Sequence, residues 1–377
     1  MGRSSGQRIY LDYNASTPIA PEVADVMRGL LERAFGNPSS PHWAGAPARE
    51  SVEAARGKVA ALLGCSPSEI VFTSGGSEAN NLALKGVFFA SDRPRKHIIT
   101  TQVEHPAITE PCRFLKRLGA RVTWLPVDGT GMIDPDDLRR AISSDTILIS
   151  VMHANNETGT IQPVEDCAAI AREHGVPFHA DAAQSVGKIP VRADDLGADL
   201  LSIAGHKLYA PKGIGALFIR GGVTLEPLIH GAGYEGGRRA GTESALMAAA
   251  LGAACDLAAD LTGMEQVKRL RDHFWDGLKE RFGAGVALNG HVVERLPNTL
   301  NVSFVGRVGS EILAALDGVA ASTGSACHAD RIELSPVLEA MGVEPKVGMG
   351  AIRFSLGRGT TRQEIDKVIA ALQVAIV

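Results

Sequence analysis

The stretch IVFTSGGSEANN, from Ile70 to Asn81, contains an apolar strand, a glycine-rich turn and the start of a helix. The backbone N–H groups of Gly75, Gly76 and Ser77 would point into one concavity at the helix N-terminus. Such a turn binds phosphate through unpaired donors and the helix dipole. A plain turn capped by Ser77 is the alternative. The glycine spacing matches neither a dinucleotide-binding fingerprint nor a nucleoside-triphosphate loop.

Strand and helix patterns alternate in the same way over the first two thirds of the chain. Helical periodicity marks Ala46–Leu63, which Gly64 closes, and Val164–His174. The predicted strands are Ile70–Thr73, His97–Thr100, Val122–Pro126, Thr146–Met152, Pro177–Ala180, Leu200–Ala204 and Gly215–Ile219. This order predicts an α/β fold, with a largely parallel central sheet sandwiched by helices.

The rhythm changes after about Ala259, where a charged helix pattern leads into isolated strands and helices. These segments are Met264–Phe282, Thr299–Phe304, Ser310–Leu316, Ala351–Ser355 and Thr361–Val374. We interpret them as a smaller α+β domain. The predicted boundaries give a large domain over residues 16–259 and a small domain made of residues 1–15 and 260–377.

Composition and charge exclude several classes of protein. The 377 residues have a net charge of −4, so no basic field draws the chain to nucleic acid or to a membrane surface. The least polar stretch, Ser244–Cys255, is shorter than the roughly 20 residues of a membrane span. No secretory signal is visible at the start, and a cytoplasmic location is predicted. The five scattered cysteines indicate free thiols, with neither a disulfide framework nor a metal site.

Polar residues follow several predicted strands, at the point where each strand ends. These residues are His105 in VEHPAI, Asn155, Asn156 and Glu157 in MHANNETG, Asp181 in FHADAAQSVGK, and His206 and Lys207 in LLSIAGHKLYAPKGIGALFI. Each has an ordinary structural interpretation when taken alone: Asp181 as a helix cap, Lys207 as an exposed turn lysine, and the others as turn or packing residues.

Their common placement favours one shared ligand, because the carboxyl ends of parallel strands meet at one edge of a sheet. A phosphate cradle, an acid, a lysine and amides would converge there. Pyridoxal 5′-phosphate (PLP) needs a lysine for its aldehyde, a carboxylate for its ring nitrogen and backbone N–H groups for its phosphate. The sequence therefore predicts a PLP site.

With these segments in this order, the chain resembles the class V PLP-dependent enzymes, specifically the cysteine desulfurases of the NifS/IscS type. The resemblance covers nearly the whole length and rests on YLDYNASTP (Tyr10–Pro18), FGNPSSPH (Phe35–His42), TSGGSEANN, MHANNETG, DAAQ, GHK, GSAC and AIRFSLGR (Ala351–Arg358). It implies the PLP-dependent transferase fold of type I and conversion of L-cysteine to L-alanine.

The resemblance implies a role for each residue around the cofactor. Lys207 would hold PLP as a Schiff base and take part in catalysis. Asp181 would pair with the pyridinium nitrogen, Gln184 would bond the ring oxygen, and His105 would stack on the ring and help to move protons. The residues that would hold the phosphate are Gly76, Ser77 and His206. In a homodimer of this family, Thr242 would reach the phosphate of the neighbouring subunit's cofactor.

On the substrate side, the resemblance implies that Asn156 and Arg353 grip the carboxylate of L-cysteine, with Asn156 also beside the cofactor. Cys327, in STGSACHAD (Ser322–Asp330), falls on the cysteine that forms the persulfide in this family. An acceptor protein would then take the sulfur for iron–sulfur assembly, tRNA thiolation or DNA phosphorothioation. His328 is a candidate base for the thiol, although adjacent side chains on a strand point apart.

Three departures from the family pattern stand out. Ala204 stands where the family often has a serine, three residues before the lysine. The usual Gly-Gly-Gln-Glu stretch appears as Gly233-Tyr234-Glu235-Gly236, and His328 and Asp330 stand where many relatives have small hydroxyl residues. Selenocysteine lyases share a related pattern, and this activity is the main alternative. A nicotinamide-dependent oxidoreductase or a non-catalytic α/β binding domain is the remote alternative, and either would be a colourless protein.

Overall fold

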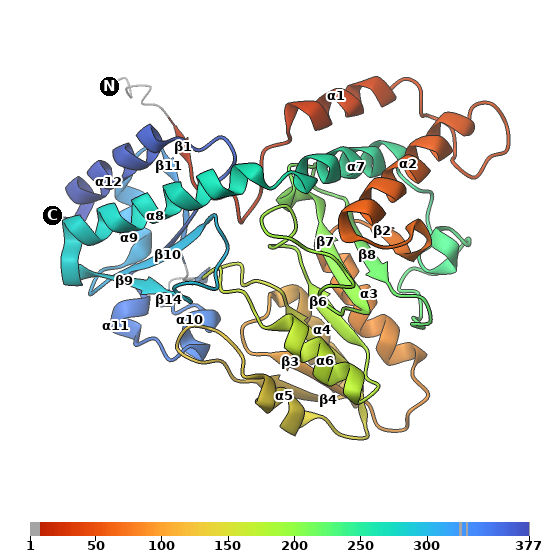
Figure 1. Ribbon diagram of the computed structural model, residues 1–377, viewed down its shortest axis with the longest axis horizontal. Helices are drawn as coiled ribbons and strands as arrows, with labels where there is room; N and C mark the ends of the chain where they lie inside the picture. The colour runs from red at the N-terminus through yellow and green to blue at the C-terminus, as the bar shows by residue number, and fades with distance from the viewer. Residues whose placement is uncertain (1–7, 324–325, 329–330, 377) are drawn as a thin grey trace.

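The computed structural model describes residues 8–323, 326–328 and 331–376, and its largest element is a seven-stranded sheet (Figure 1). The strand order is β2-β8-β7-β6-β5-β3-β4, and β8 runs antiparallel to both of its neighbours while the other neighbouring pairs are parallel. The bounds are β2 Ile70–Thr73, β3 His97–Thr101, β4 Arg121–Leu125, β5 Thr146–Met152, β6 Phe178–Asp181, β7 Leu200–Ala204 and β8 Gly215–Ile219. The largely parallel sheet is confirmed, and the predicted strands agree with the observed ones to within one residue at each end.

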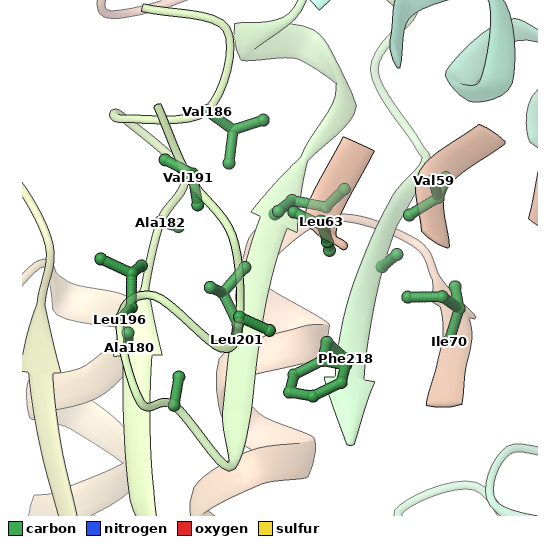
Figure 2. Close-up of a cluster of buried hydrophobic side chains, with 14 of the residues drawn as sticks. Val59, Leu63, Ile70, Ala180, Ala182, Val186, Val191, Leu196, Leu201 and Phe218 are labelled. Carbon is green, nitrogen blue, oxygen red and sulfur yellow. The ribbon is translucent and has the colours of Figure 1, made fainter. Parts of the chain in front are cut away.

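Helices cover both faces of this sheet, as predicted. One face carries α1 Pro21–Leu30, α2 Ala46–Leu63, α5 Pro135–Ala141, α6 Val164–Glu173 and α7 Ala245–Ala259, and the other carries α3 Gly76–Ala90 and α4 Pro106–Arg117. Figure 2 shows the first core, where Leu63 of α2, Ile70 of β2, Leu201 of β7 and Phe218 of β8 pack together, each at most 1% exposed. Burial of each such side chain contributes about 1.5–3 kcal/mol to the stability of this part of the fold.

A separate four-stranded antiparallel sheet has its own core. Its order is β12-β15-β10-β9, with β9 Val286–Asn289, β10 Thr299–Phe304, β12 Ser322–Thr323 and β15 Ala351–Ser355. Helices α8 Thr262–Phe282, α9 Gly309–Ala315 and α12 Arg362–Ile376 pack against it. Phe274 and Phe354 meet there with ring centroids 4.9 Å apart. This part lies on the left of Figure 1, next to the seven-stranded sheet, and it forms the predicted smaller α+β unit.

The remaining elements are short. Strand β1 Ile9–Tyr10 pairs with β11 Val319–Ala320, and helices α10 Pro336–Ala340 and α11 Pro345–Gly348 precede β15. Strands β13 Ala326–His328 and β14 Arg331–Glu333 form a two-stranded sheet in which Cys327 is paired with Ile332. The backbone of Cys327 and His328 is thus placed, while their side chains and all of Asp330 lie outside the described residues.

Within the described ranges, no single helix is long and apolar enough to cross a membrane. Helix α7 and the helical segment after it (262–285) meet the length and composition criteria only as a pair, and they are bent by 71° at their junction. Nine residues of α7 are buried against the rest of the protein, including Leu251 and Cys255.

Candidate active site

A cavity of about 630 Å³ lies where the carboxyl ends of β5, β6 and β7 meet the N-terminus of α3. The fold brings most of the predicted site residues to its wall: Gly76, Ser77, His105, Asn156, Asp181, Gln184, His206, Lys207 and Arg353. These residues are far apart in the sequence. The parallel strands bring most of them to one edge of the sheet, and β15 brings Arg353 to the same place. The predicted convergence at the strand ends is therefore present in the structure.

The turn before α3 lies at one end of the cavity, where the first N–H groups of the helix lack helical acceptors, although the N–H of Gly75 donates to Thr73 Oγ1 at 3.4 Å. Helix α3 begins at Gly76 with Gly75 as its N-cap and without a side-chain cap, so the alternative that Ser77 caps it is wrong. A Cβ on Gly76 would lie 3.2 Å from the Cβ of Ala204, and one on Gly215 would lie 2.7 Å from the backbone of Gly75. Only residues without side chains permit this close packing, which shapes a concave cradle of N–H groups.

His206 completes this end of the cavity. Its Nδ1 atom is buried and has no hydrogen-bond partner among the described residues. Burial, followed by the nearby charge of Lys207, lowers the pKa of His206 to about 4, so the ring is neutral near pH 7. A buried polar atom without a partner is costly unless a ligand satisfies it. Together with the free helix N-terminus, it fits a phosphate group.

Asp181 is held on two sides at the end of β6. Its Oδ2 accepts a hydrogen bond from Asn80 Nδ2 at 2.7 Å, and its Oδ1 accepts one from the backbone N–H of Ala183 at 2.9 Å. The predicted helix cap is therefore wrong, because a turn and not a helix follows β6. Asp181 instead accepts within that turn, and it lines the cavity as well. A carboxylate orientated by two donors in a 6% exposed position suits a partner with a fixed N–H group.

His105 lies at the N-cap of α4, where its Nδ1 accepts from the N–H of Ala107 at 3.0 Å. Burial is the largest cause that lowers the pKa of His105; Asp181 opposes this shift and Lys207 adds to it. Since Nδ1 is an acceptor, the neutral ring carries its proton on Nε2. His105 therefore offers one N–H to the cavity.

Lys207 follows β7 in a short 3₁₀ turn, Gly205–Lys207. Its Nζ donates to the carbonyl oxygens of Asn14 and Ala15, the latter at 2.9 Å. Burial, and then the charge of Arg353, lowers the pKa of Lys207 to about 8. A lysine in this range supplies an appreciable fraction of neutral amine near pH 7–8, which is the form that attacks an aldehyde or takes a proton.

Arg353 projects from β15 of the smaller sheet into the same cavity. Its Nη2 donates to Asp12 Oδ1 at 2.8 Å and its Nη1 donates to the carbonyl of Asn156 at 3.0 Å. Its Nε is buried and has no partner among the described residues. A guanidinium held in this way is preset to receive a carboxylate.

Two of the predicted site residues are absent from the described wall of this cavity. Thr242 lines a neighbouring cavity of about 250 Å³, together with Ser74, Gly213 and Ile214, which border both cavities. Tyr234, the departure noted above, contacts Thr242 and accepts from Asn37 Nδ2 at 3.1 Å. Cys327 is the other predicted residue, and its side chain lies outside the described residues.

Sequence reasoning missed Asn14, Asn80 and Asp12, although each lies in a quoted motif. Asn14 contacts the site through Gln184 and Lys207, Asn80 through Asp181, and Asp12 through Arg353. These pairs are between 101 and 341 residues apart in the chain. One sequence shows that the motifs are present, but it does not show which side chains meet.

Known proteins define the class to which this fold and site belong. Residues 9–368 match the family model described as "Aminotransferase class-V", and the chain belongs to that family. Its relatives include "Cysteine desulfurase IscS" of Dictyoglomus turgidum, 48% identical over 97% of this chain and 94% of that protein. The fold is similar to a "NIFS-LIKE PROTEIN", with a TM-score of 0.92 and 37% identity over 98% of this chain and 99% of the other.

A further solved structure, "SspA in complex with cysteine", has a TM-score of 0.84 and 37% identity over 94% of this chain and all of the other. These similarities confirm the predicted resemblance to NifS/IscS cysteine desulfurases and, with it, the predicted dependence on PLP. The cavity fits that cofactor, because it combines a lysine, a carboxylate, a cradle of N–H groups and the unpartnered Nδ1 of His206.

Proposed function

We propose that the protein is a PLP-dependent cysteine desulfurase that converts L-cysteine to L-alanine and transfers the sulfur to Cys327 as a persulfide. The observation that carries this proposal is the convergence of Lys207, Asp181 and the α3 N-terminus with Arg353 in one cavity. The first three suit PLP, and the guanidinium suits the carboxylate of an amino acid.

PLP, when bound, supplies an electron sink for the charge that develops at the Cα atom of the substrate. Lys207 would hold it, the carboxylate of Asp181 would accept from its ring N–H, and Gln184 would bond its ring oxygen. The phosphate-binding residues would be Gly76, Ser77 and His206. The ring of His105, neutral and protonated on Nε2, would stack on the cofactor.

The substrate is orientated and deprotonated by residues of this chain. Arg353 and Asn156 would bind the carboxylate of L-cysteine, which places its Cα within the cavity. The amine of Lys207, whose lowered pKa leaves a usable neutral fraction, would take the proton from Cα. The Nε2–H of His105 would then return or relay a proton within the cavity.

The sulfur-transfer step requires a thiolate on Cys327. Its attack on the substrate sulfur forms an S–S bond while the Cβ–S bond breaks and its electron pair stays with the carbon skeleton. Protonation of that skeleton gives alanine, and Cys327 keeps the sulfur as a persulfide. The other cysteines do not suit this role: Cys65, Cys112, Cys167 and Cys255 are free thiols whose pKa is raised to about 12 by burial.

The segment that carries Cys327 is attached at both ends beside the cavity. At one end, Ser322 Oγ donates to Asp12 Oδ1 at 2.9 Å, next to Arg353. At the other, Ser335 Oγ donates to Glu157 Oε2 at 2.5 Å, next to Asn156. Cys327 is four residues from β12, a reach of roughly 14 Å in extended chain, which supports access to the substrate.

Further parts of the proposal concern organisation. We place the domain boundaries at 16–259 and at 1–15 with 260–377, supported by separate hydrophobic cores. A homodimer is supported by exposed Phe35 and Trp43, which are 70% and 81% accessible. A reducing compartment such as the cytoplasm suits the free thiols, and an acceptor protein would receive the sulfur.

Purified protein tests the proposal through colour and product. We expect a yellow protein that forms alanine and sulfide from L-cysteine with a reductant, and Lys207→Ala to lose both the colour and the activity. Cys327→Ala should keep the colour and lose turnover of cysteine. Full activity of Cys327→Ala on cysteine would refute the persulfide mechanism, whereas turnover of selenocysteine alone would favour selenocysteine lyase. A colourless wild type would favour the oxidoreductase or binding-domain alternative.

A further inference from the structure

Lys188 is a buried amino group that the mechanism above does not use. It is 8% exposed, and it does not line the main cavity but lies behind Gln184. Its Nζ donates to Gln184 Oε1 at 2.7 Å and to Asn14 Oδ1 at 3.4 Å. Both partners are neutral amide oxygens, and Lys188 forms no salt bridge within the described part of the chain.

Backbone carbonyls determine which way the two amides around Lys188 point. The Nδ2 of Asn14 donates to the carbonyl of Asn156 at 3.2 Å, so its Oδ1 faces Lys188. The Nε2 of Gln184 donates to the carbonyl of Asn14 at 3.0 Å, so its Oε1 also faces Lys188. A carbonyl can only accept and an ammonium can only donate, so this arrangement of donors is self-consistent.

These hydrogen bonds determine which atoms of the Gln184 amide face the cavity. Lys188 occupies Oε1 and the carbonyl of Asn14 occupies one N–H of Nε2, so the second N–H is the group that remains available to the cavity that Gln184 lines. An NH₂ group donates to an anionic oxygen, whereas a carbonyl would repel it. Lys188 and the carbonyl of Asn14 therefore together orientate Gln184 with a donor toward the cavity.

The charges around Lys188 also favour an anionic oxygen in front of Gln184. Burial lowers the pKa of Lys188, and the facing groups Lys207 and Arg353 lower it further. The nearby acidic groups, Asp12 and Asp181, are engaged with Arg353 and with Asn80. These effects favour the uncharged amine of Lys188, and an anionic oxygen bound in front of Gln184 would shift the balance back toward the ammonium form.

We propose that Lys188 is a positioning residue, which orientates Gln184 so that its NH₂ group faces the ring oxygen of PLP and which stabilises the anionic form of that oxygen. This inference rests on the proposed function, because it concerns the same cofactor. Lys188 itself touches neither cofactor nor substrate. Its effect is electrostatic and acts through one hydrogen bond.

The pH-dependent absorbance of the bound cofactor tests this role. The chromophore releases one proton as the pH rises, and both the Gln184 donor and the Lys188 charge favour the deprotonated form. Lys188→Met should therefore move the transition to higher pH by about 1 unit. PLP binding to the apo-protein, followed by tryptophan fluorescence, should weaken about tenfold. Lys58→Met, on the exposed surface, is the matched control and should change neither value.

A double-mutant cycle separates positioning from general stability. In the Gln184→Ala background, the shift caused by Lys188→Met should fall to less than half, because the hydrogen-bonded route is gone. A lower melting temperature with an unmoved transition would overturn the proposal. If Lys188→Met does not fold, Lys188→Gln replaces it; it removes the charge, so an unmoved transition again overturns the role. A wild type that binds no PLP would instead refute the proposed function.

Discussion

The cofactor end of the seven-stranded sheet and the segment 322–335 that carries Cys327 are built in different ways. The cofactor end presents Asp181, His206 and Lys207 from strand ends packed between two hydrophobic cores. In segment 322–335, β13 and β14 pair only with each other among the described strands, and a two-stranded sheet alone is marginally stable. In the proposed function, proton chemistry at the cofactor end needs fixed geometry, whereas Cys327 would have to meet both substrate and acceptor. The difference in construction matches this division.

Segment 322–335 is attached to the rest of the protein at both of its ends. Ser322 and Ser335 hold its two ends through Asp12 and Glu157, and α10 follows it directly. Val337 and Leu338 of α10 pack with Val103 and Met152 at the strand ends. The ends of the segment are thus tied to the cofactor end, while the cysteine lies midway between them.

Asp181→Asn should have the largest effect, because it acts at the fixed cofactor end. The amide keeps the size and the contact with Asn80 but removes the charge that would stabilise the ring N–H. We expect kcat for alanine formation to fall about 10³-fold. The cofactor should remain bound, as measured by absorbance. Asp256→Asn, an exposed control on α7, should retain full activity.

Arg353→Lys tests the contact between the cofactor end of the sheet and segment 322–335. Lysine keeps the charge but loses the fork that contacts Asp12 and Asn156, so we expect kcat/KM for cysteine to fall about 50-fold. The loss should be mainly in KM, because the carboxylate binds less tightly. Arg362→Lys, an exposed change at the start of α12, is the control. Equal kcat/KM for Arg353→Lys and wild type would contradict a bidentate contact.

Acid should weaken the large sheet before the small one. Burial lowers the pKa of His97, His153 and His179 to about 4, against about 6.5 in an unfolded chain. Between pH 6.5 and 4 the unfolded state therefore binds more protons at these histidines than the folded state does. As the pH decreases through this range, each such histidine lowers the free energy of unfolding by about 1.4 kcal/mol per pH unit. Hydrogen exchange at pH 5 should show earlier loss of protection in β5 and β6 than in β10 and β15. Simultaneous loss in both sheets would contradict this order.

His328→Gln should have the smallest effect, and it bears on segment 322–335 alone. If His328 assists the Cys327 thiolate, the pH profile of Cys327 alkylation should move upward by about half a unit to one unit. His291→Gln, a change in the turn after β9, serves as the control. An unchanged alkylation profile would eliminate His328 as the base.

Much of the fold was predictable because its signals are local. The apolar run Thr146–Met152 and the periodic helix Ala46–Leu63 have the observed bounds as predicted, since burial pattern and glycine stops act over a few residues. The presence of Asp181, Lys207 and Arg353 at one cavity was also predictable from the motifs, while their roles stay predictions. The contacts of Asn14 were not, because its partners Gln184, Lys188 and Thr299 lie on segments that only the folded chain brings together.

Taken alone, the amino-acid chain specifies the α/β class, the family and the motif residues that line the cavity, because local patterns and motif order reveal them. Only the folded chain determines which groups share a hydrogen bond and which groups lose their contact with water. Burial lowers the pKa of Lys207 to about 8, and Lys188 and the carbonyl of Asn14 together orientate the amide of Gln184. Desolvation and hydrogen-bond direction depend on neighbours in space, which a linear chain does not specify.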